Sequence, residues 1–431
     1  MSNMINKAQG FGLSVLTKLA SSEVLDQMKL RKWLEKSLYH SSKTGFRTLS
    51  QTQKIFKKNQ SQEKTRLGTT STHLFDLSLS DEQRMTVEAI TDFAEQVLKP
   101  LASQADHEAK YPEQLHQYIH DLGLHYYALP EHLGGVANEQ STVTNVLIAE
   151  YLARGDLTLS AGMLSTFSAI NCLTRWGNQE IQNRYLAAFT EEGSISASFA
   201  VEENTPAFNP YQLRTHATFK QAQYYLSGEK TLVFLAEQAD FFIVSAMYNN
   251  TPELFVVEAT NLISIKNAPA MGLKALETAT LHFDQTPAQR LTDHDFQYTE
   301  FLNFGYLMWG ALAVGTCEAI KTYCIQYANE RTAFGEPISH RQSVAFMIAD
   351  MAIEIEAMRL LVWNAASLAE TGQDFNREAY LARLLCAEKA MKTATDGVQI
   401  LGGHGFTKEH PVERWYRDLR AIAINHSGLH A

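Results

Sequence analysis

The residues of this sequence whose types could do chemistry fall into a few small groups. The run Gly402-Gly403-His404-Gly405 would let backbone approach a ligand where a Cβ would clash, but read alone it also fits a loop or a helix end. Of two acidic pairs, Asp81-Glu82 and Glu202-Glu203, the first lies at an expected helix start, where carboxylates are favoured. No GxGxxG occurs, so a nicotinamide site has no support.

The cysteines and the net charge exclude several other classes of site. The four cysteines lie apart, at positions 172, 317, 324 and 386, so we expect neither a disulfide framework nor a zinc site. The formal net charge of −10 disfavours a nucleic-acid partner. No run of 18 or more apolar residues appears, so no transmembrane helix is expected. The simplest location is a reducing, cytoplasmic one.

The first part of the chain, over 1–72, is a basic arm followed by a linker. Residues 1–70 hold 13 Lys and Arg against four Asp and Glu, and apolar residues recur among them at helical spacing. Such an amphipathic helix could lie on an anionic membrane surface or dock onto a partner, and it could equally pack on its own body or on a sister subunit. Targeting peptides are poor in acidic residues, whereas the arm contains several, so a cleaved targeting peptide is the less expected interpretation. A mitochondrial location would follow only if the arm is such a targeting segment. The polar run over 50–72 reads as the linker.

The remaining chain predicts helices, then strands, then helices. Ser80 and Gln83 fit a capping box, and helical patterns continue over 73–193. Short runs rich in Val, Phe, Tyr and Thr follow over 194–290, separated by turns, as in an antiparallel β-domain. The expected strands include 196–201, 224–227, 241–246 and 254–257. Long helical periods return over 291–431. The fold class is therefore α+β multidomain.

Several motifs within these helical and strand-rich segments resemble the acyl-CoA dehydrogenase family. The two most specific are Arg331-Thr332-Ala333-Phe334-Gly335, and Gln399-Ile400-Leu401-Gly402-Gly403-His404-Gly405-Phe406 followed by Arg417-Asp418. Weaker matches include Arg175-Trp176-Gly177-Asn178 before the strands, and Met271-Gly272-Leu273-Lys274 near their end. Together these segments cover about residues 80–428 in the family's order.

The resemblance implies a homodimer or homotetramer whose subunits have N-terminal helices, a middle β-domain and a C-terminal four-helix bundle. FAD would lie between the β-domain and the bundle, with its adenine end reaching a neighbouring subunit. The substrate would be an acyl-CoA thioester: a carboxylate takes the α-proton while hydride passes from Cβ to flavin N5. An electron-transferring flavoprotein would reoxidise the flavin. The base must be water-free and poised near the working pH.

The resemblance also assigns residues to the cofactor. Arg331 matches the arginine that crosses to the neighbour's FAD, and its guanidinium suits paired phosphate oxygens. Phe334 matches an aromatic contact and Gln342 a polar one, while Gly402 and Gly403 allow close approach of backbone. The other positions implied to contact FAD are Gln399, Val201 and Glu202.

The expected flavin-ring side departs from the family pattern. The β-domain loop usually reads Thr-Glu-Pro-Gly-x-Gly-Ser-Asp, whereas residues 202–209 read Glu-Glu-Asn-Thr-Pro-Ala-Phe-Asn. Only Glu203 is kept. The next strand usually brings Trp-x-Thr against the ring, and Leu232-Val233-Phe234 stands there instead. Both the aromatic contact and the hydroxyl facing N5 are therefore replaced.

The expected base departs as well. Most relatives place a glutamate about nine residues after the Arg-Asp pair, and that position is His426. Another branch places it on the first bundle helix, at Gly305, with a substrate-side arginine at the position of Tyr306. An imidazole titrates near pH ~6.5 and could take the proton, although His426 could also be a solvated histidine. Glu203, whose loop borders the flavin pocket, is a further candidate base.

These observations leave three hypotheses. The first is an FAD-dependent acyl-CoA dehydrogenase-like oxidoreductase with His426 in place of the glutamate. The second is a subunit of the same fold that binds FAD or acyl-CoA without dehydrogenating it. The third keeps FAD and the fold but uses oxygen. Acyl chain length is not predicted by any of these motifs.

Overall fold

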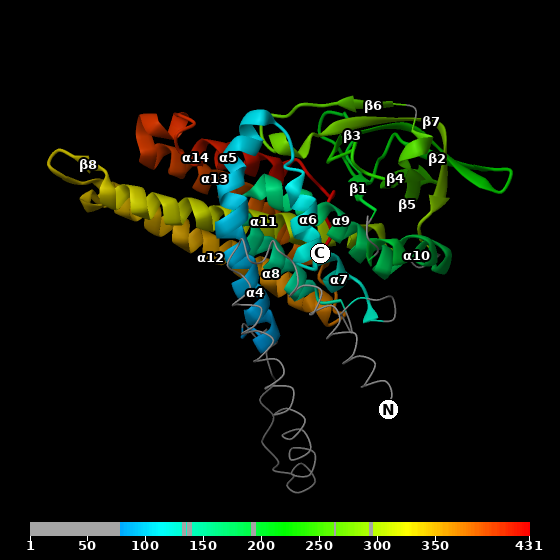
Figure 1. Ribbon diagram of the computed structural model, residues 1–431, viewed down its shortest axis with the longest axis horizontal. Coiled ribbons are helices and arrows are strands. Elements are labelled where there is room, and N and C mark those ends of the chain that lie inside the picture. The colour runs from blue at the N-terminus through cyan, green and yellow to red at the C-terminus, as the bar shows by residue number, and fades with distance from the viewer. Residues whose placement is uncertain (1–77, 132–134, 136–139, 191–194, 263, 293–295) are drawn as a thin grey trace, which may run out of the picture. The chain divides into compact units, whose positions relative to one another are not determined.

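The computed structural model describes residues 78–131, 135, 140–190, 195–262, 264–292 and 296–431 (Figure 1). The basic arm predicted over 1–72, with its expected membrane or partner contact, lies outside the described residues. Residues 86–431 form one compact unit that contains the sheet and the long helices.

Helices form the first part of the described chain. The predicted capping box is confirmed: Gln83 N donates to Ser80 Oγ (3.1 Å) and Ser80 N donates to Gln83 Oε1 (3.0 Å). The helices are α4 (Asp81–Phe93), the π-helical turn η1 (Ala94–Leu98), α5 (Lys99–Glu108), α6 (Gln114–Asp121), α7 (Leu124–Ala128), α8 (Thr142–Ala153), α9 (Leu157–Trp176) and α10 (Gln179–Tyr185). The cap of α9 is Asp156, whose carboxylate accepts from Leu159 N (3.0 Å).

One helix of this part, α9, is long and apolar enough to cross a membrane by length and composition alone. Its apolar window has a mean hydropathy of 1.2, and 89% of that window is buried inside the fold. It packs against α7, α8, α11 and β1. A helix that is apolar all round and covered on every side is typical of a protein core.

The middle part is a seven-stranded sheet that curves back on itself. Its strands are β1 (Ala197–Ala200), β2 (His216–Lys220), β3 (Gln223–Val233), β4 (Phe241–Tyr248), β5 (Thr251–Glu258), β6 (Ser264–Asn267) and β7 (Ala279–Arg290). The order is β1-β4-β2-β3-β7-β5, β5 also pairs with β4, and the seventh strand, β6, pairs with β7. Most pairs are antiparallel as predicted, whereas β1 and β2 both run parallel to β4. Apolar side chains such as Leu226, Phe242, Phe255 and Leu281 fill the inside.

The last part is a bundle of long helices that lie side by side (Figure 1). Its long helices are α11 (Tyr298–Glu330), α12 (Gln342–Glu370) and α13 (Asn376–Leu401), and the short α14 (Val412–Leu419) packs against α13. The short hairpin of β8 (Thr332–Ala333) and β9 (Glu336–Pro337) lies between α11 and α12. Small residues let the helices approach closely. A Cβ on Gly310 would lie 2.8 Å from Val362, and one on Gly397 would lie 2.7 Å from Ile320.

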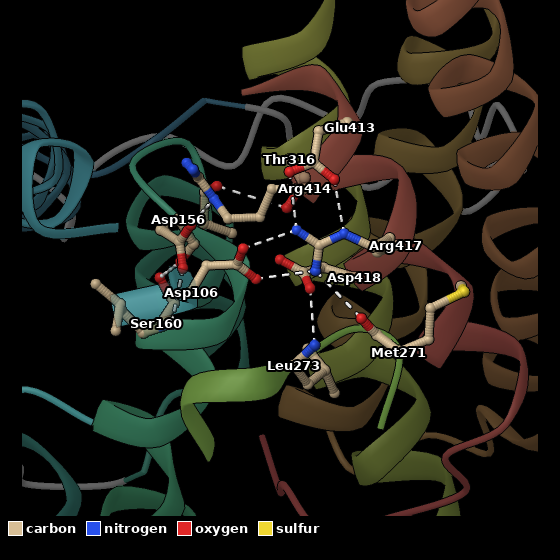
Figure 2. Close-up of polar contacts among 12 residues, drawn as sticks. Asp106, Asp156, Ser160, Met271, Leu273, Thr316, Glu413, Arg414, Arg417 and Asp418 are labelled. Carbon is tan, nitrogen blue, oxygen red and sulfur yellow. Dashed lines mark hydrogen bonds and ion pairs between the residues drawn. The ribbon is translucent and has the colours of Figure 1, made fainter. Parts of the chain in front are cut away.

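A buried ionic network joins α14 to the other two parts (Figure 2). Arg417 donates to both carboxylate oxygens of Asp106 on α5 (2.9 and 2.8 Å), and Asp418 accepts from Leu273 N (2.7 Å). Arg414 pairs with Asp156, the cap of α9, at 3.1 Å. Burial opposes ionisation of Asp106, but the bond and charge of Arg417 outweigh it, so the pKa of Asp106 is lowered. The motif Arg417-Asp418 therefore fixes where the chain after it enters the site.

Candidate active site

The chain after α14 runs between the sheet and the bundle, and its backbone is held from three sides. Arg383 on α13 donates to Asn425 O (2.6 Å), and Trp309 on α11 donates to Ser427 O (2.7 Å). The third contact comes from the loop after β1, where Glu202 Oε1 accepts from His426 N (2.6 Å). Two of these three partners, Arg383 and Glu202, are charged, and charge-assisted bonds fix the backbone path of 425–427, which follows the short helical turn η8 (Arg420–Ala423).

The ring of His426 lies against the carboxylate of Glu202. His426 Nδ1 is 3.4 Å from Glu202 Oε2, within ion-pair range. The ring is not aligned for a hydrogen bond, so Nδ1 is buried with no hydrogen-bond partner among the described residues. The edge of the ring meets Phe208, with centroids 5.4 Å apart.

The two positions at which the family places its glutamate meet in this structure. A Cβ on Gly305 would lie 3.0 Å from His426 O and 3.1 Å from the Cα of Ser427. A glutamate at 305 would therefore displace the segment that carries His426. The next residue, Tyr306, lies under the guanidinium of Arg383 (4.6 Å), and burial raises the pKa of Tyr306 to about 12. Tyr306 offers a neutral hydroxyl where the resemblance implied an arginine.

The second acidic residue of the loop, Glu203, is occupied by a fully buried lysine. Lys230 Nζ donates to Glu203 Oε1 (2.9 Å), to Val201 O (2.9 Å) and to Ser245 Oγ (3.1 Å). Burial lowers the pKa of Lys230 to about 8, against the charge of Glu203. Burial alone would raise the pKa of Glu203, but Lys230 and two backbone amides hold it lowered. Glu203 is a structural anion rather than a free base.

The end of β3, where the family's Trp-x-Thr would stand, is covered by the chain itself. Leu232 has a left-handed backbone (φ 54°), which carries Phe234 into the interior, where it is 4% exposed. The Phe234 ring lies against Trp309, with centroids 5.9 Å apart, and a Cβ on Gly428 would lie 3.4 Å from it. Gly428 has φ 90°, a conformation that favours glycine.

The last described residues are buried in the same space. Leu429, His430 and Ala431 are fully buried, and the His430 ring packs against Trp176 and Phe304, each at 4.8 Å between centroids. Neither ring nitrogen of His430 has a hydrogen-bond partner within the described part of the chain. Burial, helped by the charge of Arg175, holds the pKa of His430 well below its usual range. This imidazole is therefore neutral.

The residues assigned to the nucleotide end of FAD are exposed, unlike those of the His426 region. Those on the surface are Arg331, Phe334, Gln342, Gln399, Gly402 and Gly403, with Phe334 96% exposed. Tyr327, one turn before Arg331 on α11, contacts the Gly-Gly turn: its hydroxyl lies 2.9 Å from His404 Nδ1. No atom lies within 4 Å of a Cβ built on Gly402 or Gly403. The two motifs thus share one open surface.

Several residues of the site were missed by sequence reasoning. Glu202 was assigned to the cofactor, yet its carboxylate contacts the backbone and the ring of His426. Lys230, Trp309 and Arg383 were not singled out. A lysine within a strand rich in Tyr, Leu and Val was a usable signal for Lys230, because a lysine is almost never fully buried unless it is paired. Trp309 and Arg383 lie on long helices and carry no local signal.

The fold and the site together define a three-part helix–sheet–helix protein with a site where the sheet meets the bundle. Residues 80–193 match the description "Acyl-CoA dehydrogenase, N-terminal domain", and residues 297–426 match "Acyl-CoA dehydrogenase, C-terminal domain". An acyl-CoA dehydrogenase of Bacillus subtilis is 30% identical over 366 residues, covering 81% of this chain and 95% of the relative. The chain belongs to the acyl-CoA dehydrogenase family.

Solved structures agree with this assignment. Butyryl-CoA dehydrogenase from Megasphaera elsdenii superposes with a TM-score of 0.75 at 27% identity, covering 82% of this chain and 96% of that one. A chain in the structure described as the electron transferring flavoprotein of Acidaminococcus fermentans superposes with a TM-score of 0.74 at 28% identity, covering 82% of this chain and 96% of that one. The three-part fold inferred from the sequence is thereby confirmed.

The described residues fit one half of FAD and not the other. An exposed guanidinium, an exposed aromatic ring and two uncovered glycines suit the adenine and phosphate end. The ring end is different, because Phe234, Trp309 and Gly428 pack together where the family's Trp-x-Thr would face the flavin. With the segment over 428–431 in its described position, the flavin ring does not fit.

Proposed function

We propose that this chain is an FAD-binding oxidoreductase of the acyl-CoA dehydrogenase type, in which His426 takes the place of the catalytic glutamate. The observation that carries the proposal is that the two family base positions meet: a Cβ built on Gly305 would lie 3.0 Å from the backbone oxygen of His426, and of these two residues only His426 has a side chain that can take a proton. When bound, FAD would supply the hydride acceptor.

In this proposal the chain's own residues bind, orient and move one proton. Arg331 and the Gly402-Gly403 turn hold the phosphates, and binding the flavin ring requires Gly428 and the residues after it to leave Phe234. His426 takes the α-proton of the acyl-CoA at a ring nitrogen, and the tightly held backbone on either side keeps that ring in place. A positioned base of this kind contributes roughly 10²–10⁴-fold to rate.

The electron acceptor and the assembly belong to the same proposal. The likeness to a chain described with an electron transferring flavoprotein supports such a protein as acceptor. Exposed apolar side chains on α12 and the β8–β9 hairpin, among them Phe334, Phe346 and Ile353, support a homodimer or homotetramer. Light scattering of the purified protein should give two or four copies, and a monomer would refute the assembly.

The test is a visible absorbance spectrum followed by an anaerobic titration. Purified protein supplied with FAD should show flavin bands, and acyl-CoAs of several lengths should bleach them. Flavin bands that no acyl-CoA bleaches would refute the dehydrogenase assignment.

A second candidate function is a subunit that binds nucleotide or acyl-CoA but does not dehydrogenate it. The observation that favours it is the contact of Gly428 with Phe234, next to the fully buried residues 429–431, where the flavin ring would lie. On this hypothesis the full chain gives no flavin bands, whereas a variant lacking 428–431 gains them. Flavin bands of equal strength in both proteins would refute it.

A further inference from the structure

The carboxylate of Glu202 contacts a single segment, the one that carries His426. Its Oε1 accepts from the backbone N–H groups of His426 (2.6 Å) and Ser427 (3.4 Å), and its Oε2 lies 3.4 Å from His426 Nδ1. Glu202 is 7% exposed, so water contributes little to balancing its charge. The loop after β1 and the segment after α14 are thus joined through one buried carboxylate.

The charge of Glu202 attracts that of Lys230 through space, but neither a lysine nor an arginine is bonded to Glu202 among the described residues. The lysine nearest in the fold, Lys230, is already bonded to Glu203, and no ion pair joins Glu202 to an arginine or lysine in the part of the chain that the structure describes. The partners left to it are two amide N–H groups and the imidazole. A buried carboxylate that is bonded to no lysine or arginine favours a neighbour that donates a hydrogen bond to it. The imidazole can do so only from Nδ1.

We propose that Glu202 is a positioning residue for His426: it accepts Nδ1–H and so leaves the lone pair of Nε2 to take the substrate proton. This rests on the proposed function. In the step itself the α C–H bond breaks, its electron pair stays on the substrate as an enolate, and the proton goes to Nε2 while Nδ1–H stays bonded to Glu202. A carboxylate that fixes the tautomer of a catalytic histidine is a known catalytic device.

Glu202 and His426 are also the two departures from the family pattern that contact each other. The resemblance places a threonine at 202 and a glutamate at 426. The contact between these two positions therefore still contains one carboxylate, but it belongs to residue 202 instead of residue 426. A histidine alone at 426 would have two nearly equivalent tautomers. The carboxylate at 202 removes that ambiguity.

The variant Glu202→Gln isolates the charge. A glutamine Oε1 can still accept from the amides of His426 and Ser427, so the backbone clamp is retained. Its NH₂ group then faces Nδ1 and must donate, which forces the ring into the tautomer with the proton on Nε2. The variant Glu202→Asp keeps an acceptor for Nδ1–H and should keep the original tautomer.

The experiment is ¹⁵N nuclear magnetic resonance of histidine-labelled full-length protein, with the His426 signal assigned by its loss in His426→Gln. The wild type and Glu202→Asp should show the Nδ1–H form, and Glu202→Gln the Nε2–H form. Glu229→Gln is the matched control, because it removes the carboxylate of another Glu–His pair, Glu229 Oε2 and His282 Nε2 at 3.0 Å, whose side chains are both exposed. It should leave the His426 signal unchanged.

The outcomes separate this proposal from the proposed function. If Glu202→Gln leaves the His426 tautomer unchanged, or the wild type shows the Nε2–H form, Glu202 is a backbone clamp only and the proposal falls. If Glu202→Gln inverts the His426 tautomer but acyl-CoA bleaches the flavin of neither the wild type nor any variant, Glu202 does position His426 and the dehydrogenase assignment falls. If acyl-CoA bleaches the flavin of the wild type, Glu202→Gln should slow that bleaching by roughly 10²-fold or more. Glu202→Asp should keep most of the wild-type bleaching rate.

Discussion

The surface around Arg331 and the buried region around His426 are the two regions to which the family resemblance assigns cofactor or substrate roles, and they differ from the family pattern in different ways. At the surface, the residues match the family and lie open to solvent, with free space beside Gly402 and Gly403. In the buried region two residues that differ from the family pattern, Glu202 and His426, contact each other, and Phe234, which stands in place of the family's threonine, contacts Gly428.

The difference follows from burial. An exposed residue can keep or lose its role without affecting its neighbours, because water replaces what is lost. A buried charge or ring must be matched by its contacts, since an unpaired buried group costs about 1–3 kcal/mol or more. Changes in the buried region are therefore informative only when both members of a contact are considered.

The largest expected effect is on proton transfer in the buried region. His426→Gln should lower the rate of anaerobic flavin bleaching by roughly 10²–10⁴-fold, because glutamine cannot take the α-proton. Stopped-flow absorbance measures the rate, and His282→Gln, on the sheet surface, is the control. A bleaching rate within about twofold of wild type in His426→Gln would remove His426 from the mechanism.

The next effect concerns the buried ion pair beside the site. Lys230→Met should lower the free energy of unfolding by about 3–5 kcal/mol, because it leaves Glu203 charged and unpaired in the interior. Urea unfolding measures the loss. The double variant Lys230→Met with Glu203→Gln should regain part of it, since the charge is then gone. A cost below about 1 kcal/mol for Lys230→Met would show that Glu203 is not held as a buried anion.

A smaller effect is expected at the open surface. Arg331→Ala should weaken FAD binding by about 1.5–3 kcal/mol, or roughly 10–100-fold in Kd, through loss of charge-assisted bonds to phosphate. Fluorescence titration with FAD measures it. Arg377→Ala is the control, because Arg377 is 80% exposed and pairs only with its neighbour Glu378 among the described residues. Equal weakening in both variants would mean that the effect is general electrostatics.

The smallest effect is a dependence of stability on pH that comes from His430. Its pKa is lowered in the fold, so protons bind the unfolded chain more tightly, and its contribution is complete above about pH 6.5 and lost as pH falls below that value. Between about pH 7.5 and 5.5, urea unfolding of the wild type should lose about 1 kcal/mol more than that of His430→Phe. The exposed His107→Phe should behave like wild type, and a parallel loss in all three would contradict the burial of His430.

Local and family patterns predicted much of the fold. Ser80 and Gln83 gave the first helix start because a capping box acts within three residues. Runs of β-branched and aromatic residues located β4 and β5 within a few positions. The parallel pairing of β1 with β4 was not predicted, because pairing depends on connections far apart along the chain.

The site was predicted in part. Counting from Arg417-Asp418 assigned the base position to His426, and that role stays a prediction; the structure shows that this pair is fixed against Asp106 and Leu273. The contact of Glu202 with His426 spans 224 residues, and no pattern in either segment indicates it. The path of 428–431 beside Phe234 was equally hidden, because it depends on the space left by other side chains.

The most direct test of coupling between Glu202 and His426 is a double-mutant cycle on the bleaching rate with Glu202→Thr and His426→Glu. Each single variant should be slow: the first loses the group that orients His426, and the second places two carboxylates in contact. The double variant, which restores the residue types expected from the family, should be faster than either single variant, with a coupling of about 1 kcal/mol or more. Single effects that add in the double variant would show that Glu202 and His426 do not act together, and would contradict a shared role in proton transfer.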